Sequence, residues 1–371
     1  MVALWIDYNA ARCLACYNGN MTQLADMLDA RTRPGTLFEK NSGAVRCLAC
    51  AHRCRIQPGK RGICQMRFNR DGTLFVPWGY VAAANVDPIE KKPFMHFLPG
   101  EEALTFGMLG CNFQCDFCQN WLSSQALRDP ASDSSARYIQ DISAEELVQY
   151  ALRMGAKIIA SSYNEPLITT EWALEIFKKA KKHGLKCVYV SNGFATPEAL
   201  DALSPYLDGF KIDLKCLSDA KYRTLGGRLE AVLETISGAH ARGMWVEVVT
   251  LVIPGFNDSN DELWGSARAV SVVSADIPWH VTAYFPTYKR TNGGRTPAET
   301  IQRAAEIGQE AGLRYVYAGN LPGRVGSLEN TYCPACQSLL IERVGYSVTR
   351  NTITADGACP DCGTPIAGVW K

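Results

Sequence analysis

The sequence of 371 residues has no long apolar run, and no stretch approaches the roughly 18 consecutive apolar residues of a membrane span. A secretory leader pattern is also missing, because no basic segment precedes an apolar run in the opening residues MVALWIDYNAARCLAC. Neither sign of charge predominates, since the sequence has 38 basic and 37 acidic side chains and a net charge of +1. We therefore expect a cytoplasmic protein without a membrane partner and without a nucleic-acid partner.

Internal repeats and low-complexity segments are likewise absent. Apolar residues make up 47% of the chain and charged residues 20%, which is ordinary for a globular protein. The length predicts roughly two to three domains, enough for a large α/β barrel with small appendages.

Cysteine is what the sequence holds in abundance. Disulfide frameworks belong to short secreted chains, whereas tight groups of cysteines in a long cytoplasmic chain indicate metal binding or catalysis. The 15 cysteines stand at 13 and 16, at 47, 50, 54 and 64, at 111, 115 and 118, and at 333, 336, 359 and 362, with Cys187 and Cys216 alone.

The middle of the chain alternates short apolar runs with helical patterns, which predicts β–α units and a parallel sheet. A capping box between Ser143 and Glu146 marks one helix start, and the polar segment 128–142 is expected to be an exposed loop. The predicted strands are 103–108, 157–163, 186–193, 209–215, 245–253, 279–285 and 314–319.

The strongest chemical signal is the segment GCNFQCDFCQNW, which places Cys111, Cys115 and Cys118 directly after the first predicted strand. Cysteine thiolates hold iron–sulfur clusters, and a cubane normally takes four of them. Three ligands leave one iron open for another molecule, at the strand end where barrel enzymes carry their chemistry. The alternative is a structural zinc knuckle with a fourth ligand elsewhere.

The C-x3-C-x2-C spacing, with Phe117 before the third cysteine, resembles the signature of the radical S-adenosylmethionine superfamily. The runs VRCLACAHRCRIQPGKRGICQMRFNRDG and NVDPIEKKPFMHFLPG resemble the AmmeMemoRadiSam-system radical enzymes, which are related to pyruvate formate-lyase activating enzymes. The similarity covers about residues 35 to 371.

This resemblance implies a 4Fe–4S cluster whose open iron is chelated by S-adenosylmethionine. Reductive cleavage of that molecule would yield a 5′-deoxyadenosyl radical, which abstracts hydrogen from a substrate. The substrate, a small molecule or a protein or peptide, is not identified by any motif. The resemblance also implies a flavodoxin- or ferredoxin-like electron donor.

Several cofactor contacts are carried over by the same resemblance. Tyr163-Asn164-Glu165-Pro166 stands where the superfamily usually has Gly-Gly-Glu, so this position departs from the common pattern. The residues implied to contact S-adenosylmethionine are Phe117, Asn164, Glu165, Ser191, Asn192, Asp213, Lys215, Val252 and His280.

Two further cysteine sets flank the predicted barrel. Cys333, Cys336, Cys359 and Cys362 form two C-x2-C pairs that predict a zinc ribbon, with a second iron–sulfur cluster as the alternative. Cys47, Cys50, Cys54 and Cys64 offer four ligands for structural zinc or an auxiliary cluster, with His52 as a possible substitute. The pair Cys13 and Cys16 has no clear role.

The fold expected from these observations is α/β, a partial (β/α)6-type radical S-adenosylmethionine barrel. Its predicted divisions are an N-terminal extension (1–34), a Cys-rich module (35–100), the barrel (101–320) and a zinc-ribbon-like module (321–371).

Three functions compete. The first is a radical enzyme acting on its own substrate, and the second is an activating enzyme that installs a glycyl radical on a partner protein. The third is a non-catalytic zinc-binding adaptor, which explains neither the barrel nor the three-cysteine loop.

Overall fold

The computed structural model describes residues 21–371, so Cys13 and Cys16 lie outside the described residues. Its centre is an eight-stranded sheet in the order β16-β15-β14-β13-β12-β11-β9-β8. Neighbouring strands are parallel, except that β8 (Ala83–Pro88) runs antiparallel to β9. The parallel strands are β9 (Glu102–Gly107), β11 (Ile158–Ser161), β12 (Lys186–Ser191), β13 (Gly209–Asp213), β14 (Trp245–Val252), β15 (Trp279–Ala283) and β16 (Val316–Gly319).

These strands form because they are short apolar runs that can be buried on both faces, as parallel strands require. All seven predicted strands are present, and the fold is confirmed as α/β. Within residues 21–371, β16 and β8 are the two edges and do not pair with each other, so the sheet is a partial barrel.

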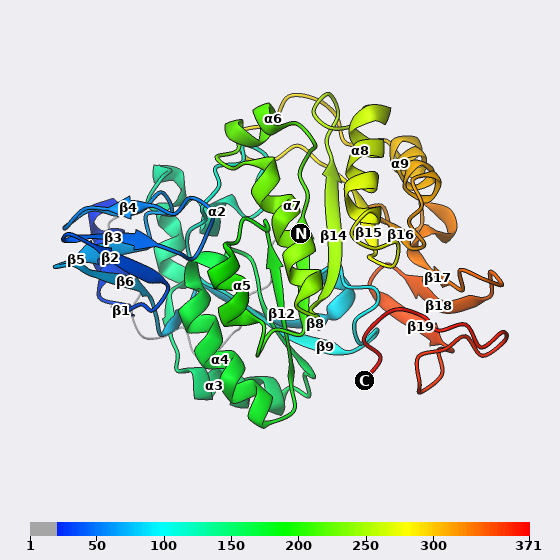
Figure 1. Ribbon diagram of the computed structural model, residues 1–371, viewed down its shortest axis with the longest axis horizontal. Coiled ribbons are helices and arrows are strands. Elements are labelled where there is room, and N and C mark those ends of the chain that lie inside the picture. The colour runs from blue at the N-terminus through cyan, green and yellow to red at the C-terminus, as the bar shows by residue number, and fades with distance from the viewer. Residues whose placement is uncertain (1–20) are drawn as a thin grey trace.

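Helices between the strands pack on the outside of the sheet (Figure 1). They are α2 (Trp121–Ser124), α3 (Ala144–Arg153), α4 (Thr170–Lys182), α5 (Pro197–Leu203), α6 (Asp219–Thr224), α7 (Leu229–Ala241), α8 (Asn260–Ser271) and α9 (Ala298–Glu310), with 3₁₀ turns η1 (Ile89–Lys91), η3 (Pro166–Thr169) and η4 (Gly326–Glu329). The predicted capping box is confirmed: Ser143 Oγ accepts from the Glu146 N–H at 3.2 Å, and the Glu146 carboxylate accepts from the Ser143 N–H at 2.8 Å. Such a cap stabilises a helix by about 1 kcal/mol.

The N-terminal module consists of small antiparallel sheets on one side of the barrel (Figure 1). One sheet has the order β1-β6-β5, and another β2-β3-β4. Because β1 joins β6, the segment 32–34 belongs structurally with the residues that follow it. Its elements are α1 (Met21–Asp29), β1 (Thr32–Pro34), β2 (Phe38–Asn41), β3 (Ala44–Cys47), β4 (Arg55–Ile56), β5 (Phe68–Arg70), β6 (Thr73–Pro77) and β7 (Tyr80–Val81).

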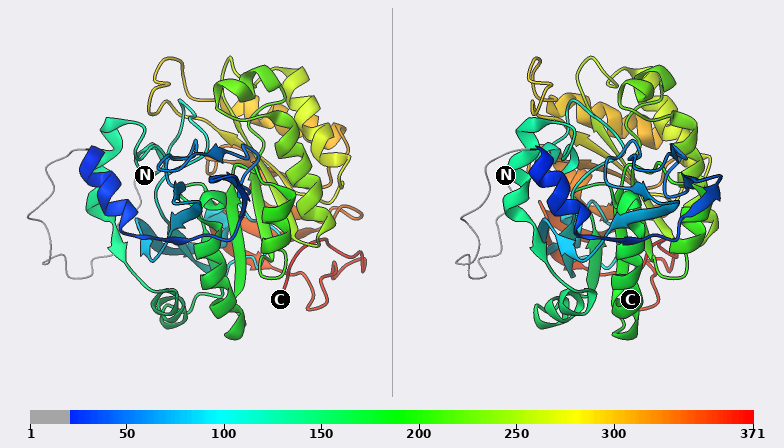
Figure 2. Two further views of the ribbon diagram at one scale, coloured as in Figure 1. Left: turned by 60° about the vertical axis from the view of Figure 1, so that its left-hand side comes forward. Right: turned by 90° about the vertical axis from the view of Figure 1, so that its left-hand side faces the viewer.

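The expectation of an exposed loop over 128–142 is wrong. This segment holds the 3₁₀ helix η2 (Pro130–Tyr138), which lies beside α1 (Figure 2), and β10 (Gln140–Asp141), which pairs with β7. Ser132 is fully buried because its hydroxyl donates to the Asp129 carbonyl at 2.6 Å. Short polar side chains that satisfy local backbone groups can be buried without cost, and composition does not reveal this.

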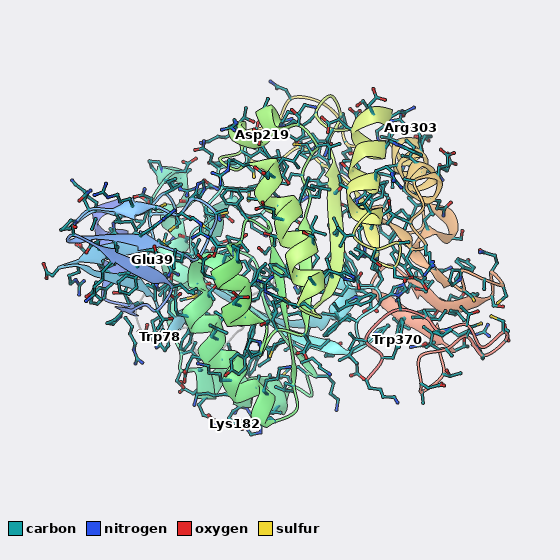
Figure 3. The ribbon with its side chains drawn as sticks, viewed as in Figure 1. Glu39, Trp78, Lys182, Asp219, Arg303 and Trp370 are labelled. Atoms are coloured by element: carbon teal, nitrogen blue, oxygen red, sulfur yellow. The ribbon has the colours of Figure 1, made fainter. Side chains whose placement is uncertain are left out.

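The C-terminal module is a three-stranded antiparallel sheet of β17 (Thr331–Tyr332), β18 (Leu339–Val344) and β19 (Ser347–Asn351). It docks on the barrel through Phe97, which forms a bridge with Val369, and through His96, whose ring bonds the Ala367 carbonyl at 2.6 Å. Figure 3 labels Glu39 in the N-terminal module and Trp370 in the C-terminal one, on opposite sides of the barrel. In residues 21–371, no helix has the length and apolarity needed to cross a bilayer.

A buried ion pair fastens the N-terminal module to the barrel. The Arg67 guanidinium donates twice to the Glu171 carboxylate, with both N–O distances 2.7 Å, and the two side chains are 1% and 6% exposed. The same carboxylate accepts from the Leu37 N–H at 3.2 Å. Burial alone would raise the pKa of Glu171, but Arg67 lowers it below its ordinary value, so both partners are charged.

Glu171→Gln should lower the free energy of unfolding by about 3 kcal/mol or more, because it leaves the Arg67 charge buried and unpaired. Chemical denaturation followed by circular dichroism measures this. Glu175→Gln, on the same helix but paired with Lys179 at the surface, is the matched control and should cost about 1 kcal/mol or less. Equal effects of the two variants would contradict the assigned role of the buried pair.

Candidate metal and cofactor site

The three-cysteine loop leaves the sheet at the carboxyl end of β9. Gly110 has φ +93°, and a Cβ at this position would stand 2.3 Å from Met66 Cγ, so only glycine fits here. Its N–H donates to the Ser123 carbonyl at 2.8 Å, and its carbonyl accepts from the Glu165 N–H at 3.2 Å. The loop is therefore fixed on both sides before Cys111 is reached.

Cys111, Cys115 and Cys118 are buried or half-buried in this loop. Burial raises the pKa of all three thiols, that of Cys115 to about 12. Three such thiols become thiolates only where a cationic group compensates their charge, and iron in a cluster supplies that charge. The donor set thus fits a 4Fe–4S cluster held by three cysteines, which Cys111, Cys115 and Cys118 would ligate.

Two side chains hold the loop in shape. Arg128 donates to the Phe113 carbonyl at 2.7 Å and also to the Cys111 carbonyl. Asn192 Nδ2 donates to Asn112 Oδ1 at 2.7 Å and lies 3.9 Å from Cys111 Sγ. Sequence reasoning missed Arg128 because it stands in the segment taken for an exposed loop, and it missed Asn112 because no motif marks it.

Glu165, Ser191 and Asn192 form one hydrogen-bonded unit beside the loop. The Glu165 carboxylate accepts from Ser191 Oγ at 2.6 Å and from the Asn192 N–H at 2.9 Å. It is 3% exposed, and burial raises the pKa of Glu165 to about 7. A buried carboxylate whose pKa lies near neutral pH is suited to bind a cationic ligand.

Asn164 is already engaged by the protein. Its Oδ1 accepts from the Met108 N–H at 2.9 Å, and its Nδ2 donates to the Glu165 carbonyl at 3.3 Å. The Asn164 side chain therefore holds the segment after the carboxyl end of β9 against the segment after the carboxyl end of β11, next to the predicted site.

A charged group lies at the end of β13. Asp213 accepts from Lys215 Nζ at 3.2 Å and from Lys211. Burial lowers the pKa of Lys215, but Asp213 and Cys115 raise it more, so the ammonium group stays charged. Its positive charge in turn lowers the pKa of Cys115 and Cys118, against the larger effect of burial.

Aromatic rings cover the other side of the loop. The Phe117 ring packs 5.8 Å from Phe256, and the Lys215 ammonium stands 6.0 Å from the Phe117 ring. Val252, the last residue of β14, is fully buried. It stands just before the turn that contains Phe256 and Asn257. Asn257, which the sequence did not single out, ties the turn to β13 by donating to the Lys215 carbonyl at 2.7 Å.

His280 belongs to a different set of contacts from the residues around the cysteine loop. His280 is the second residue of β15, and its Nε2 lies 2.6 Å from the Glu247 carboxylate. Glu247 also accepts from the N–H groups of Met95 and His96. The sequence located the strand correctly, but His280 stands near its amino end and serves a buried structural network.

The C-terminal cysteines converge on one point. Among residues 21–371, Cys333, Cys336, Cys359 and Cys362 are the group whose ligand atoms lie within 4.8 Å of one another. The sulfur of Cys333 lies 3.6 Å from that of Cys362, and the sulfur of Cys336 lies 3.7 Å from that of Cys359. A tetrahedral ion with metal–sulfur bonds of about 2.3 Å separates its ligands by about 3.8 Å, so four thiolates here fit one metal ion.

Two identical turns build this centre. The Cys333 N–H donates to the Ser338 carbonyl and the Cys359 N–H to the Thr364 carbonyl, both at 2.9 Å. In both turns the first cysteine is buried and the second is exposed. Hydrogen bonds from Ser338 lower the pKa of Cys336 to about 6, which favours the thiolate that a metal requires.

The fold and the cysteine loop define a partial-barrel protein with three thiols on the loop that follows the first parallel strand. The Radical SAM superfamily pattern matches residues 106–268. The uncharacterized protein MJ0808 of Methanocaldococcus jannaschii is 37% identical over 340 residues, covering 90% of this chain and 98% of that protein. The chain belongs to the radical S-adenosylmethionine superfamily.

The chain is also similar, more distantly, to activating enzymes. The isethionate sulfite-lyase activating enzyme of Oleidesulfovibrio alaskensis is 25% identical over 170 residues, covering 44% of this chain and 54% of that enzyme. A solved domain of pyruvate-formate lyase-activating enzyme from Bacteroides vulgatus has 18% identity and a TM-score of 0.37, covering 43% of this chain and 98% of that domain.

Cys336→Ser should release the metal of the C-terminal centre and increase hydrogen exchange in β17, β18 and β19. The increase should extend to the contact of His96 with Ala367, because the module docks there, while β11 to β14 stay protected. Metal analysis with hydrogen-exchange mass spectrometry measures both effects. Cys216→Ser, a lone cysteine outside the centre, is the control, and an unchanged exchange pattern in Cys336→Ser would contradict a structural metal.

Proposed function

We propose that this protein reductively cleaves S-adenosylmethionine at a 4Fe–4S cluster held by Cys111, Cys115 and Cys118, and acts on an unidentified small molecule, peptide or protein. The observation that carries the proposal is the meeting of three thiols, one buried and two half-buried, with a buried carboxylate, Glu165, and a charged ammonium, Lys215, at one end of the barrel. The electron donor is a flavodoxin- or ferredoxin-like protein, the C-terminal metal is zinc, and the protein works in the cytoplasm.

When bound, the cluster and S-adenosylmethionine supply the electron and the carbon radical that abstracts hydrogen from the substrate. The chain's own residues position these groups. Cys111, Cys115 and Cys118 would hold the cluster, and S-adenosylmethionine would bind beside it through its methionyl group.

The two charged groups are suited to opposite ends of that methionyl group. The Glu165 carboxylate accepts from its amino group, while Ser191 and the Asn192 N–H hold the carboxylate in place. The Lys215 ammonium pairs with its carboxylate, and Asp213 orients the ammonium. Phe117 and Phe256 keep water from the cluster loop.

A second candidate is the installation of a glycyl radical on a partner protein. It is favoured by the relatives, which include activating enzymes for isethionate sulfite-lyase and for (2S)-3-sulfopropanediol sulfolyase. Those similarities cover 38–46% of this chain and leave the flanking cysteine modules unexplained. The modules support a distinct substrate, so we place this function second, and the zinc-binding adaptor third.

Cys115→Ala should lose the cluster of the three-cysteine loop and stop the release of 5′-deoxyadenosine from dithionite-reduced, reconstituted protein. The measurement is chromatographic quantification of 5′-deoxyadenosine together with iron analysis. Cys187→Ala, which removes an isolated buried thiol from β12, is the matched control and should retain both properties. Cleavage by Cys115→Ala at the control's rate would refute the ligand assignment.

Binding of S-adenosylmethionine should weaken about tenfold as the pH falls from about 8 to about 6, because the protonated Glu165 carboxyl no longer attracts an ammonium group. The raised pKa means that the charged form predominates above about pH 7 and is lost below it. Calorimetric titration of reconstituted protein gives the affinity at each pH.

Glu165→Gln should bind weakly at both pH values and show a flat profile. Glu175→Gln, an acidic residue on the surface of α4, should keep the wild-type profile. An unchanged pH dependence in Glu165→Gln would show that another group governs binding.

A further inference from the structure

The N-terminal cysteines gather where two turns face the cluster loop. Cys47 ends β3 and its N–H donates to the Cys54 carbonyl at 3.0 Å, just before β4. Cys50 lies in the turn between Cys47 and Cys54. Cys64 lies in a second turn, in which the Gly62 N–H donates to the Arg67 carbonyl at 2.8 Å. Three of these cysteines are 5–7% exposed, and Cys54 is half-buried.

The two turns lie against each other. A Cβ at Gly62, in the second turn, would stand 3.6 Å from Cys54 Sγ in the first, so the four thiols share one region. Their ligand atoms do not converge as those of the C-terminal centre do, which is the one group within 4.8 Å in the described part of the chain. The two cysteine sets therefore have different dimensions.

Two buried N–H donors stand beside these thiols. Arg67 Nε and Asn112 Nδ2 belong to side chains that are 1% exposed, and neither atom has a hydrogen-bond partner among residues 21–371. The Arg67 carbonyl closes the turn that holds Cys64, and the Asn112 carbonyl lies 3.0 Å from Nε2 of His52, two residues after Cys50. A buried N–H without an acceptor costs about 1–3 kcal/mol, so both donors indicate sulfur acceptors at this place.

We propose that Cys47, Cys50, Cys54 and Cys64 bind a second 4Fe–4S cluster. A single zinc ion needs its four sulfurs about 3.8 Å apart, as the C-terminal centre provides and this set does not. A cubane spreads its four thiolates over four irons, and N–H donors to its sulfurs tune its potential. The wider spacing thus favours a cluster over an ion, and the sulfurs of that cluster would accept from the two buried donors.

The same geometry places this centre against the three-cysteine loop. Asn112 follows Cys111, its carbonyl lies 3.0 Å from His52 Nε2, and its amide reaches toward Cys50. One residue therefore connects the two cysteine sets. The site is independent of whether S-adenosylmethionine is cleaved, since it needs only the four thiols and the two donors.

The test uses a full-length variant in which Cys111→Ala, Cys115→Ala and Cys118→Ala remove the first cluster. After anaerobic reconstitution with iron and sulfide, this variant should retain about four irons per chain. It should also show the electron paramagnetic resonance signal of a reduced 4Fe–4S cluster with dithionite. Adding Cys50→Ala should remove the iron, whereas adding Cys187→Ala should not. A triple variant without iron but with about two zinc ions, one in each flanking set, would overturn the proposal.

A second variant keeps all four ligands in case Cys50→Ala does not fold. Asn112→Leu in the triple background should retain the iron but change the resonance signal and the reduction potential, because one N–H donor to sulfur is lost. An unchanged signal and potential would overturn the assigned donor. Release of 5′-deoxyadenosine by the wild-type protein is measured separately, so failure of the proposed function and failure of the second cluster can be told apart.

Discussion

Parallel pairing from β9 to β16 is the constraint on which the rest of the molecule depends, because it brings the carboxyl ends of successive strands to one edge of the sheet. The three-cysteine loop, Glu165, Asn192 and Lys215 are distant in sequence and meet only because of this pairing. The two charged side chains can be buried because each has a hydrogen-bonding partner. Ser191 donates to Glu165, and Lys215 donates to Asp213. Without those partners the site would be three thiols in an apolar pocket.

The fold was predictable because its strands are apolar runs of ordinary length with clear helix signals between them, such as the capping box at Ser143. Most of the site followed, since a residue at the end of a predicted parallel strand has a predictable position. His280 was the exception: it is the second residue both of the predicted strand 279–285 and of β15, and only the resemblance had assigned it to the site. Arg128 and Asn112 could not be found in this way. Their roles arise from contacts between segments far apart in sequence, which no local pattern encodes.

The two kinds of cysteine site illustrate the same limit. Spacing alone predicted that both flanking sets bind metal and left their chemistry open. At the C-terminus, repeated turns around Cys333 and Cys359 bring the sulfurs together as one ion requires. Among residues 21–371 the N-terminal sulfurs do not converge in this way, and the buried N–H groups of Arg67 Nε and Asn112 Nδ2 have no partner. Both properties depend on tertiary packing, so only the structure separates the two cases.

The end of the barrel opposite the cysteine loop is filled by the protein itself. Phe94 and Phe97 are fully buried against Ala103, Ile158 and Val188, near the starts of their strands. His96 is packed beneath Trp370 and Tyr315, and burial lowers its pKa to about 4, so the ring remains neutral. Packed side chains therefore close this end of the barrel to small molecules. A substrate of the proposed reaction would then have to enter and leave at the end that carries the cysteine loop.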